Sequence, residues 1–186
     1  MQVTVTRKDS KFLPDPSRVI ARFLYTSDER SKNIIRHVLA MSENEANTAL
    51  SQVLRGYSRR HRNISKIFER HYNKLSSLFK ELNITPDNLD PSRKALIGSY
   101  FTMEYSIECA AFFNPSVVED PDQSEVRQNE KRIIFSFRAT GEGHISSIVF
   151  RSGIIDKNND LHIEPVFKML AEADLIKIHV YDKINF

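Results

Sequence analysis

The chain of 186 residues is 40% hydrophobic and 27% charged, proportions that are ordinary for a folded globular protein and exclude wholesale disorder. Its formal net charge of +3 is too small to indicate a nucleic-acid partner by itself. No uninterrupted apolar stretch approaches the length of a transmembrane helix, and the N-terminus lacks a signal-peptide pattern. We therefore expect a cytoplasmic protein with no nucleic-acid partner and no membrane partner.

Residues 1–110 are predicted to form a helical N-terminal domain. From about residue 17 the apolar residues recur at helical spacing, which predicts a compact bundle of four or five helices. The last helix is expected to continue through Met103 and Ile107. Three helix starts are marked by capping signals, namely Ser27 before Asp28 and Glu29, Ser42 with Glu45 at capping-box spacing, and Asp90 followed by Pro91.

Residues 111–186 are predicted to begin a second, β-rich domain. Two β-like segments, Arg132–Phe137 and His144–Arg151, are joined by a loop that contains two glycines. A third short strand is expected at Leu161–Ile163, and a helix at Val166–Leu175. The predicted fold class is therefore α+β, with a helical bundle followed by antiparallel strands.

The loop between the two longer strands carries the residues with the most functional chemistry. Arg138 precedes Gly141, Glu142, Gly143 and His144, and glycine lets the main chain approach a ligand closely. Charged and polar side chains at strand ends around such a loop suit a sugar or phosphate site. A hairpin with a polar tip has the same pattern, so the loop alone leaves both interpretations open.

Asn114 is a second candidate for substrate contact. Its amide both donates and accepts hydrogen bonds, which matches the paired hydroxyls of a sugar. Pro115 follows it and is expected to hold the Asn114 backbone in an extended conformation. The alternative is that Asn114 is the C-terminal residue of a helix.

Arg138 is the first candidate, because its planar guanidinium can bind two hydroxyls or an anion with two parallel hydrogen bonds. The alternative is a salt bridge to Glu142 or Asp122. Glu142 is expected to shape its loop through hydrogen bonds rather than to act as a general base. His144 is a single histidine without converging ligands, which predicts no metal site, and no cofactor is expected.

Three spaced motifs together resemble glycoside hydrolase family 130. They are Phe-Asn-Pro-Ser-Val-Val from Phe113, Pro-Asp-Gln-Ser from Pro121, and Arg-Ala-Thr-Gly-Glu-Gly-His-Ile-Ser-Ser from Arg138. Two upstream segments, 12–22 and 98–108, are similar to members of this family that carry a helical N-terminal extension. The resemblance therefore covers nearly the whole chain.

The resemblance implies an enzyme that cleaves β-mannoside oligosaccharides with inversion, by hydrolysis or by phosphorolysis with inorganic phosphate as co-substrate. It implies that Asn114 and Arg138 lie in the subsite of the mannosyl ring that is cleaved, with Ser116 as a weaker neighbour. It also implies a five-bladed β-propeller. Because a blade takes roughly 40–50 residues, residues 111–186 are expected to hold only the first blade and part of a connection.

A catalytic acid is missing from the pattern. The sequence contains no Glu-Asp-Pro-Arg or Glu-Asp-Ala-Arg motif of the kind that carries the family's proposed proton donor. The similar run Glu119–Asp122 has aspartate where the arginine belongs. Asp120 and Asp122 could mimic a carboxylate pair, but beside Pro121, Gln123 and Ser124 they are expected to lie in a turn. Inverting glycosidases need a proton donor as well as activated water or phosphate. We therefore expect an amino-terminal part of an enzyme that is inactive by itself.

Two other functions compete with this hypothesis. One is a helical interaction or oligomerisation module, in which exposed strand edges pair with a second copy or with a complementary C-terminal chain. The other is nucleic-acid binding by a basic stretch, although Glu69 interrupts it and a solvated or subunit-contacting face is expected instead. The basic residues are Arg55, Arg59, Arg60, Arg62, Lys66, Arg70 and Lys74.

Overall fold

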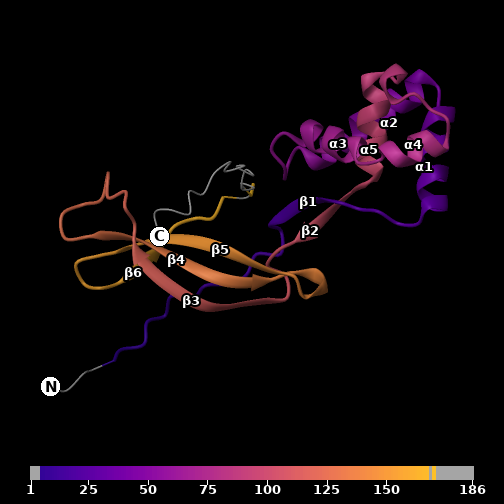
Figure 1. Cartoon of the computed structure of the whole chain (residues 1–186). Coiled ribbons are helices and arrows are strands. Elements are labelled where there is room, and N and C mark those ends of the chain that lie inside the picture. Colours follow the sequence, from indigo (N-terminus) through magenta and orange to yellow (C-terminus); the bar gives the residue numbers. More distant parts are fainter. Residues whose placement is uncertain (1–4, 168, 171–186) are drawn as a thin grey trace, which may run out of the picture.

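The computed structural model describes residues 5–167, 169 and 170 as helices, two antiparallel sheets and their connections. Figure 1 shows the helices at one end of the molecule and the larger sheet at the other, with a two-stranded ribbon between them. The helices are α1 (Asp28–Ala40), α2 (Glu43–Tyr57), α3 (Ile64–Asn73), α4 (Ser76–Glu81) and α5 (Pro91–Tyr100), with a 3₁₀ turn at Pro86–Asn88.

The strands divide into two separate sheets. The ribbon pairs β1 (Val19–Phe23) with β2 (Thr102–Ser106). The larger sheet has the order β3-β4-β5-β6, in which every neighbouring pair is antiparallel. Its strands are β3 (Ala111–Glu119), β4 (Lys131–Thr140), β5 (Ser146–Ile155) and β6 (Leu161–Ile163). The α+β class predicted from the sequence is confirmed.

Local capping signals position the helices as the sequence predicts. The Ser27 side chain accepts a hydrogen bond from the backbone of Arg30 at the start of α1. Ser42 and Glu45 form a reciprocal capping box that opens α2. The helices of this region pack around fully covered apolar side chains. These include Ile35, Val38, Phe68, Leu75, Leu78, Phe79, Leu96, Ile97 and Phe101.

The prediction that α5 continues through Met103 and Ile107 is wrong. Helix α5 ends at Tyr100, and the chain then enters β2, which pairs with β1. A Cβ at Gly98 would lie 2.0 Å from the backbone oxygen of Phe68, so only glycine allows α5 to lie this close to α3. The helical spacing of Met103 and Ile107 is overridden because pairing with a strand some 80 residues earlier satisfies the backbone better.

The larger sheet has one covered and one open face. On the inner face Phe137, Ala139 and Val149 are buried, and Phe12 from the N-terminal segment packs against them, with its ring centroid 4.9 Å from that of Phe137. On the outer face Ile148 is 72% exposed. The strands predicted at 132–137 and 161–163 are confirmed. The strand predicted at 144–151 begins at Ser146, because His144 lies in a 3₁₀ turn, and β3 is a strand that the sequence did not predict.

Val166 and Phe167 lie in no helix, so the start of the helix predicted at Val166–Leu175 is wrong, and residues 171–175 lie outside the described part of the chain. Among the described residues, no helix is long and apolar enough to cross a bilayer.

Candidate functional site

Asn114 lies at an irregularity in β3. The register of β3 against β4 shifts between Phe113 and Ser116, so Asn114 and Pro115 form a bulge. Asn114 has a φ of 53°, in the left-handed region, which asparagine tolerates better than most residues. The expectation that Pro115 keeps Asn114 extended is therefore wrong, and so is the alternative of a helix end. The bulge, not the proline, directs this side chain.

Arg138 lies opposite Phe113, directly beside the bulge. Its Nε donates a hydrogen bond to the Oγ of Ser146 at 3.1 Å, and its guanidinium carbon lies 5.4 Å from the centre of the Phe113 ring. Within the described residues Arg138 makes no ion pair with Glu142 or Asp122. Its terminal amino groups make no hydrogen bond there either, and the side chain is exposed, so these donors are open to a ligand.

The structure brings Asn114 and Arg138 together in one groove of about 390 Å³. The groove lies on the outer face of the sheet, where Ile148 of β5 is opposite Arg138. Its described lining carries amide, hydroxyl and guanidinium groups beside apolar surface and includes no carboxylate. The lining residues are Asn114, Ser136, Phe137, Arg138, Ser146, Ser147 and Ile148.

Of the other three candidates, Ser116 lies next to the groove, while Glu142 and His144 do not line it. Ser116 is opposite Ser136, which is one of the lining residues. Glu142 and His144 are exposed in the 3₁₀ turn that joins β4 to β5. The prediction that Glu142 shapes this loop through hydrogen bonds is met by its backbone and not by its carboxylate. The Glu142 backbone oxygen accepts a hydrogen bond of 2.5 Å from the Tyr105 hydroxyl, and among the described residues the carboxylate makes none.

Asp120 and Asp122 lie in the turn-like connection that follows β3, as predicted, whereas Glu119 is the last residue of β3. The Asp120 carboxylate accepts a hydrogen bond from the backbone of Asp122, and the Asp122 carboxylate accepts one from the backbone of Ser124. The Ser124 hydroxyl, which also donates to Asp122, holds the pKa of that carboxyl below its usual value. These two carboxylates therefore serve the turn and do not form a pair over the groove.

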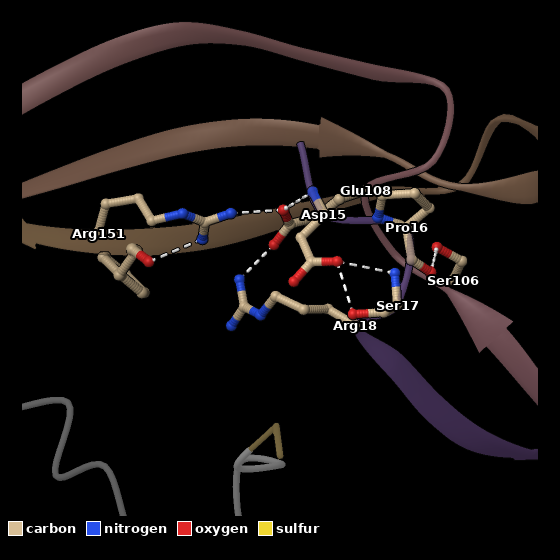
Figure 2. A network of polar contacts seen from close by, with 8 residues as sticks. Asp15, Pro16, Ser17, Arg18, Ser106, Glu108 and Arg151 are labelled. Carbon is tan, nitrogen blue, oxygen red and sulfur yellow. Dashed lines mark hydrogen bonds and ion pairs between the residues drawn. The ribbon is translucent and has the colours of Figure 1, made fainter. Parts of the chain in front are cut away.

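A buried ionic network on the inner face was not predicted from the sequence. Glu108 is fully buried and forms ion pairs with Arg18 and Arg151, which come from before β1 and from β5 (Figure 2). The backbone N–H of Asp15 donates to the same carboxylate at 3.0 Å. A charged residue at an inward position of a strand, such as Arg151 between Val149 and Gly153, is the sequence signal that points to such a network.

This network holds the N-terminal segment against the sheet behind the groove. Arg151 also donates through Nη1 to the backbone oxygen of Phe150 at 3.0 Å, and it lies 5.0 Å from the centre of the Phe112 ring. Beside it, the Ser17 hydroxyl and backbone hold the pKa of Asp15 below its usual value. Three segments far apart in the sequence are thereby fixed to each other (Figure 2).

The basic stretch on α2 and α3 is partly neutralised. Arg60 binds both carboxylate oxygens of Glu104, at 2.7 and 3.0 Å, and His61 contacts the same carboxylate at 2.8 Å. Lys74 lies over the ring of Phe23, 5.0 Å from its centre. Arg60 is therefore paired with a carboxylate of the protein itself, which reduces the positive charge that the phosphates of a nucleic acid would meet.

The groove offers donors and acceptors to a hydroxyl-rich or anionic ligand, and its described lining holds no carboxylate or imidazole that would transfer a proton. Among the described residues, no cluster of three or more His, Cys, Asp or Glu side chains could hold a metal ion. Comparisons with protein-family models, with curated proteins and with solved structures find no match for this chain.

Proposed function

We propose that the groove binds the mannosyl ring of a β-mannoside, and that the chain is the sugar-binding part of a glycosidase or phosphorylase resembling glycoside hydrolase family 130. The observation that carries the proposal is that Asn114 and Arg138 line one groove. They are 24 positions apart, and the bulge in β3 sets them side by side across two strands.

The chemistry of the groove supports a sugar as its ligand. An amide, a guanidinium and serine hydroxyls offer donors and acceptors to a ring of hydroxyls, and Ile148 offers apolar surface to the C–H face of that ring. The Arg138 guanidinium, with no carboxylate among the described lining residues, can donate hydrogen bonds to sugar hydroxyls or to an anion such as phosphate. In the phosphorolytic version of the reaction, inorganic phosphate is the co-substrate.

The antiparallel order β3-β4-β5-β6 is also what one blade of a β-propeller requires. We take these strands as one blade of a five-bladed propeller, with β3 as its innermost strand and the groove beside the bulge in β3. The proton donor of the reaction is not among the groove residues. We therefore expect this polypeptide to bind β-mannosides without turning them over, and measurable release of mannose or mannose 1-phosphate would contradict this.

The test is a titration of the chain with methyl β-D-mannopyranoside, followed by calorimetry or by NMR. Arg138→Ala and Asn114→Ala should each weaken binding about tenfold or more, because each removes hydrogen bonds to the ligand. Arg127→Ala is the matched control, since Arg127 is an exposed arginine outside the groove. Unchanged affinity in both groove variants would refute the proposal.

The alternative is an interaction or oligomerisation module, and the exposed apolar side chains of the outer face are the observation that favours it. The β3 edge itself is poorly suited to strand addition, because Pro115 cannot donate a backbone hydrogen bond and the bulge interrupts the ladder. Light scattering after size-exclusion chromatography distinguishes a monomer from an assembly. Salt-sensitive binding of an oligonucleotide would instead support the basic helices as a nucleic-acid site.

A further inference from the structure

A tyrosine of the ribbon holds the turn that joins β4 to β5. Tyr105 of β2 is 4% exposed, and its ring belongs to the apolar core that includes Phe137. Its hydroxyl donates a hydrogen bond to the backbone oxygen of Glu142 at 2.5 Å and lies 3.4 Å from the backbone oxygen of Ile145. The ribbon therefore contacts both limbs of the turn through one side chain.

The backbone of this turn is one that needs support. Gly143 and His144 have φ values of 62° and 60°, in the left-handed region. Glycine adopts this region freely, whereas histidine does so at a cost. The N–H of Gly141 donates to the backbone oxygen of Ile145 at 3.0 Å and closes the turn. The Tyr105 hydroxyl adds a tie from outside the turn to a conformation that the turn does not favour by itself.

A second observation shows that the turn and the ribbon are fitted to each other. A Cβ at Gly141 would lie 2.1 Å from the backbone oxygen of Ser106 and 2.7 Å from the Tyr105 hydroxyl oxygen. Only glycine permits so close an approach. Gly141 thus lets the end of β4 lie directly against β2, where the tyrosine can reach the turn.

The turn leads straight into the groove. Ser146 follows Ile145 and is the first residue of β5. Its Oγ accepts the hydrogen bond from the Nε of Arg138 at 3.1 Å, and both residues line the groove. The peptide between Ile145 and Ser146 sets the position of this Oγ, and the carbonyl of the same peptide is the one that Gly141 and Tyr105 contact. A shift of this peptide would move the Ser146 hydroxyl away from the guanidinium.

We propose that Tyr105 is a positioning residue of the groove. By fixing residues 141–145 it places the Ser146 hydroxyl where the Nε of Arg138 can donate to it, and it thereby orients the guanidinium for the ligand. This inference rests on the proposed function, because a guanidinium that is already oriented loses less entropy when it binds a sugar hydroxyl. It gives the ribbon, and not only the sheet, a part in ligand binding.

The experiment compares Tyr105→Phe with Tyr72→Phe. The first change removes the hydroxyl and keeps the ring, including its contact with Arg22, whose guanidinium carbon lies 5.0 Å from the ring centre. Tyr72 is the matched control, because it is also 4% exposed and its hydroxyl donates to a backbone oxygen, that of Pro86, at 3.0 Å. Both variants should lose similar stability. Affinity for methyl β-D-mannopyranoside should fall about fivefold in Tyr105→Phe and stay unchanged in Tyr72→Phe.

An NMR signal tests the same step without a ligand. The Nε–H signal of Arg138, assigned by its loss in Arg138→Lys, should exchange with water about fivefold faster in Tyr105→Phe, because its hydrogen bond to Ser146 opens more often. Tyr72→Phe should leave this exchange unchanged. In Ser146→Ala that hydrogen bond is already lost, so adding Tyr105→Phe should cost little further affinity.

The outcomes separate the two proposals. If the wild type binds the mannoside and Tyr105→Phe keeps its affinity, or if its loss adds in full to that of Ser146→Ala, the positioning role is refuted and the groove stands. If the wild type binds no mannoside, the proposed function fails and the Arg138 signal alone decides the positioning role. Unchanged exchange of that signal in Tyr105→Phe refutes the role whether or not the sugar binds.

Discussion

The helical region and the four-stranded sheet bury their apolar side chains in different ways. In the helical region, Phe68, Phe79 and Phe101 are fully covered within cores that five helices enclose. In the sheet only the inner face is covered, while Ile148 and Phe150 of the outer face stay open. The closed region contributes stability, and the half-open region presents a surface. The groove that Asn114 and Arg138 line lies on that half-open surface.

The largest expected effect is on the network that joins the N-terminal segment to the sheet. Glu108→Gln removes the buried carboxylate that forms ion pairs with the guanidinium groups of Arg18 and Arg151. The free energy of unfolding should fall by about 3–5 kcal/mol, measured by urea denaturation. Glu119→Gln is the control, since its ion pair with Lys131 is exposed and is expected to contribute little. Equal stability of the two variants would show that the inner face does not depend on this network.

A somewhat smaller effect is expected from pH in the helical region. His71 is buried, and burial, with lesser contributions from Lys74 and Arg70, lowers its pKa from 6.5 to about 4. The Thr102 hydroxyl donates to the backbone oxygen of Gly98, so the Nδ1–H of His71 donates to Thr102, at 2.7 Å. The neutral imidazole is therefore the form that fits the core.

The sign of the pH effect follows from proton binding. Between pH 6.5 and about 4 the unfolded chain binds a proton at His71 and the folded chain does not, so stability falls as the pH falls through this window. The loss should approach about 3 kcal/mol near pH 4. The difference in unfolding free energy between the wild type and His71→Gln, followed from pH 7 to 4, measures it. A difference that does not change with pH would show that His71 is not buried as a neutral group.

The smallest effect compares two neighbours on β5 that point to opposite faces. Val149 is 4% exposed and Phe150 is 61% exposed. Val149→Ala should reduce the free energy of unfolding by about 2 kcal/mol, through lost burial and a residual cavity. Phe150→Ala should change it by less than about 0.5 kcal/mol, measured by thermal or urea denaturation. If Phe150→Ala is the more destabilising of the two, the outer face is covered and the contrast between the regions is lost.

Much of the fold could be predicted because its signals are local. Ser42 and Glu45 are three positions apart, so their capping box depends only on the helix that it opens. The alternation around Phe137 and the glycines of the turn at residues 141–143 likewise predict a hairpin without reference to the rest of the chain. Asn114 and Arg138 could be singled out as candidates by residue type and motif, although their conformations could not.

The remaining features depend on residues that are distant in the sequence. The bulge that gives Asn114 its left-handed backbone exists only because β3 pairs with β4. Arg18 and Glu108 are 90 positions apart, and Glu108 and Arg151 are 43 apart, so no local pattern indicates that they meet. The sequence by itself determined the caps, the hairpin and the chemical character of the candidate residues, since these follow from short-range sterics and hydrogen bonding. Only the tertiary structure decided which strands pair, which face stays open and which candidates share a groove, because these depend on long-range packing.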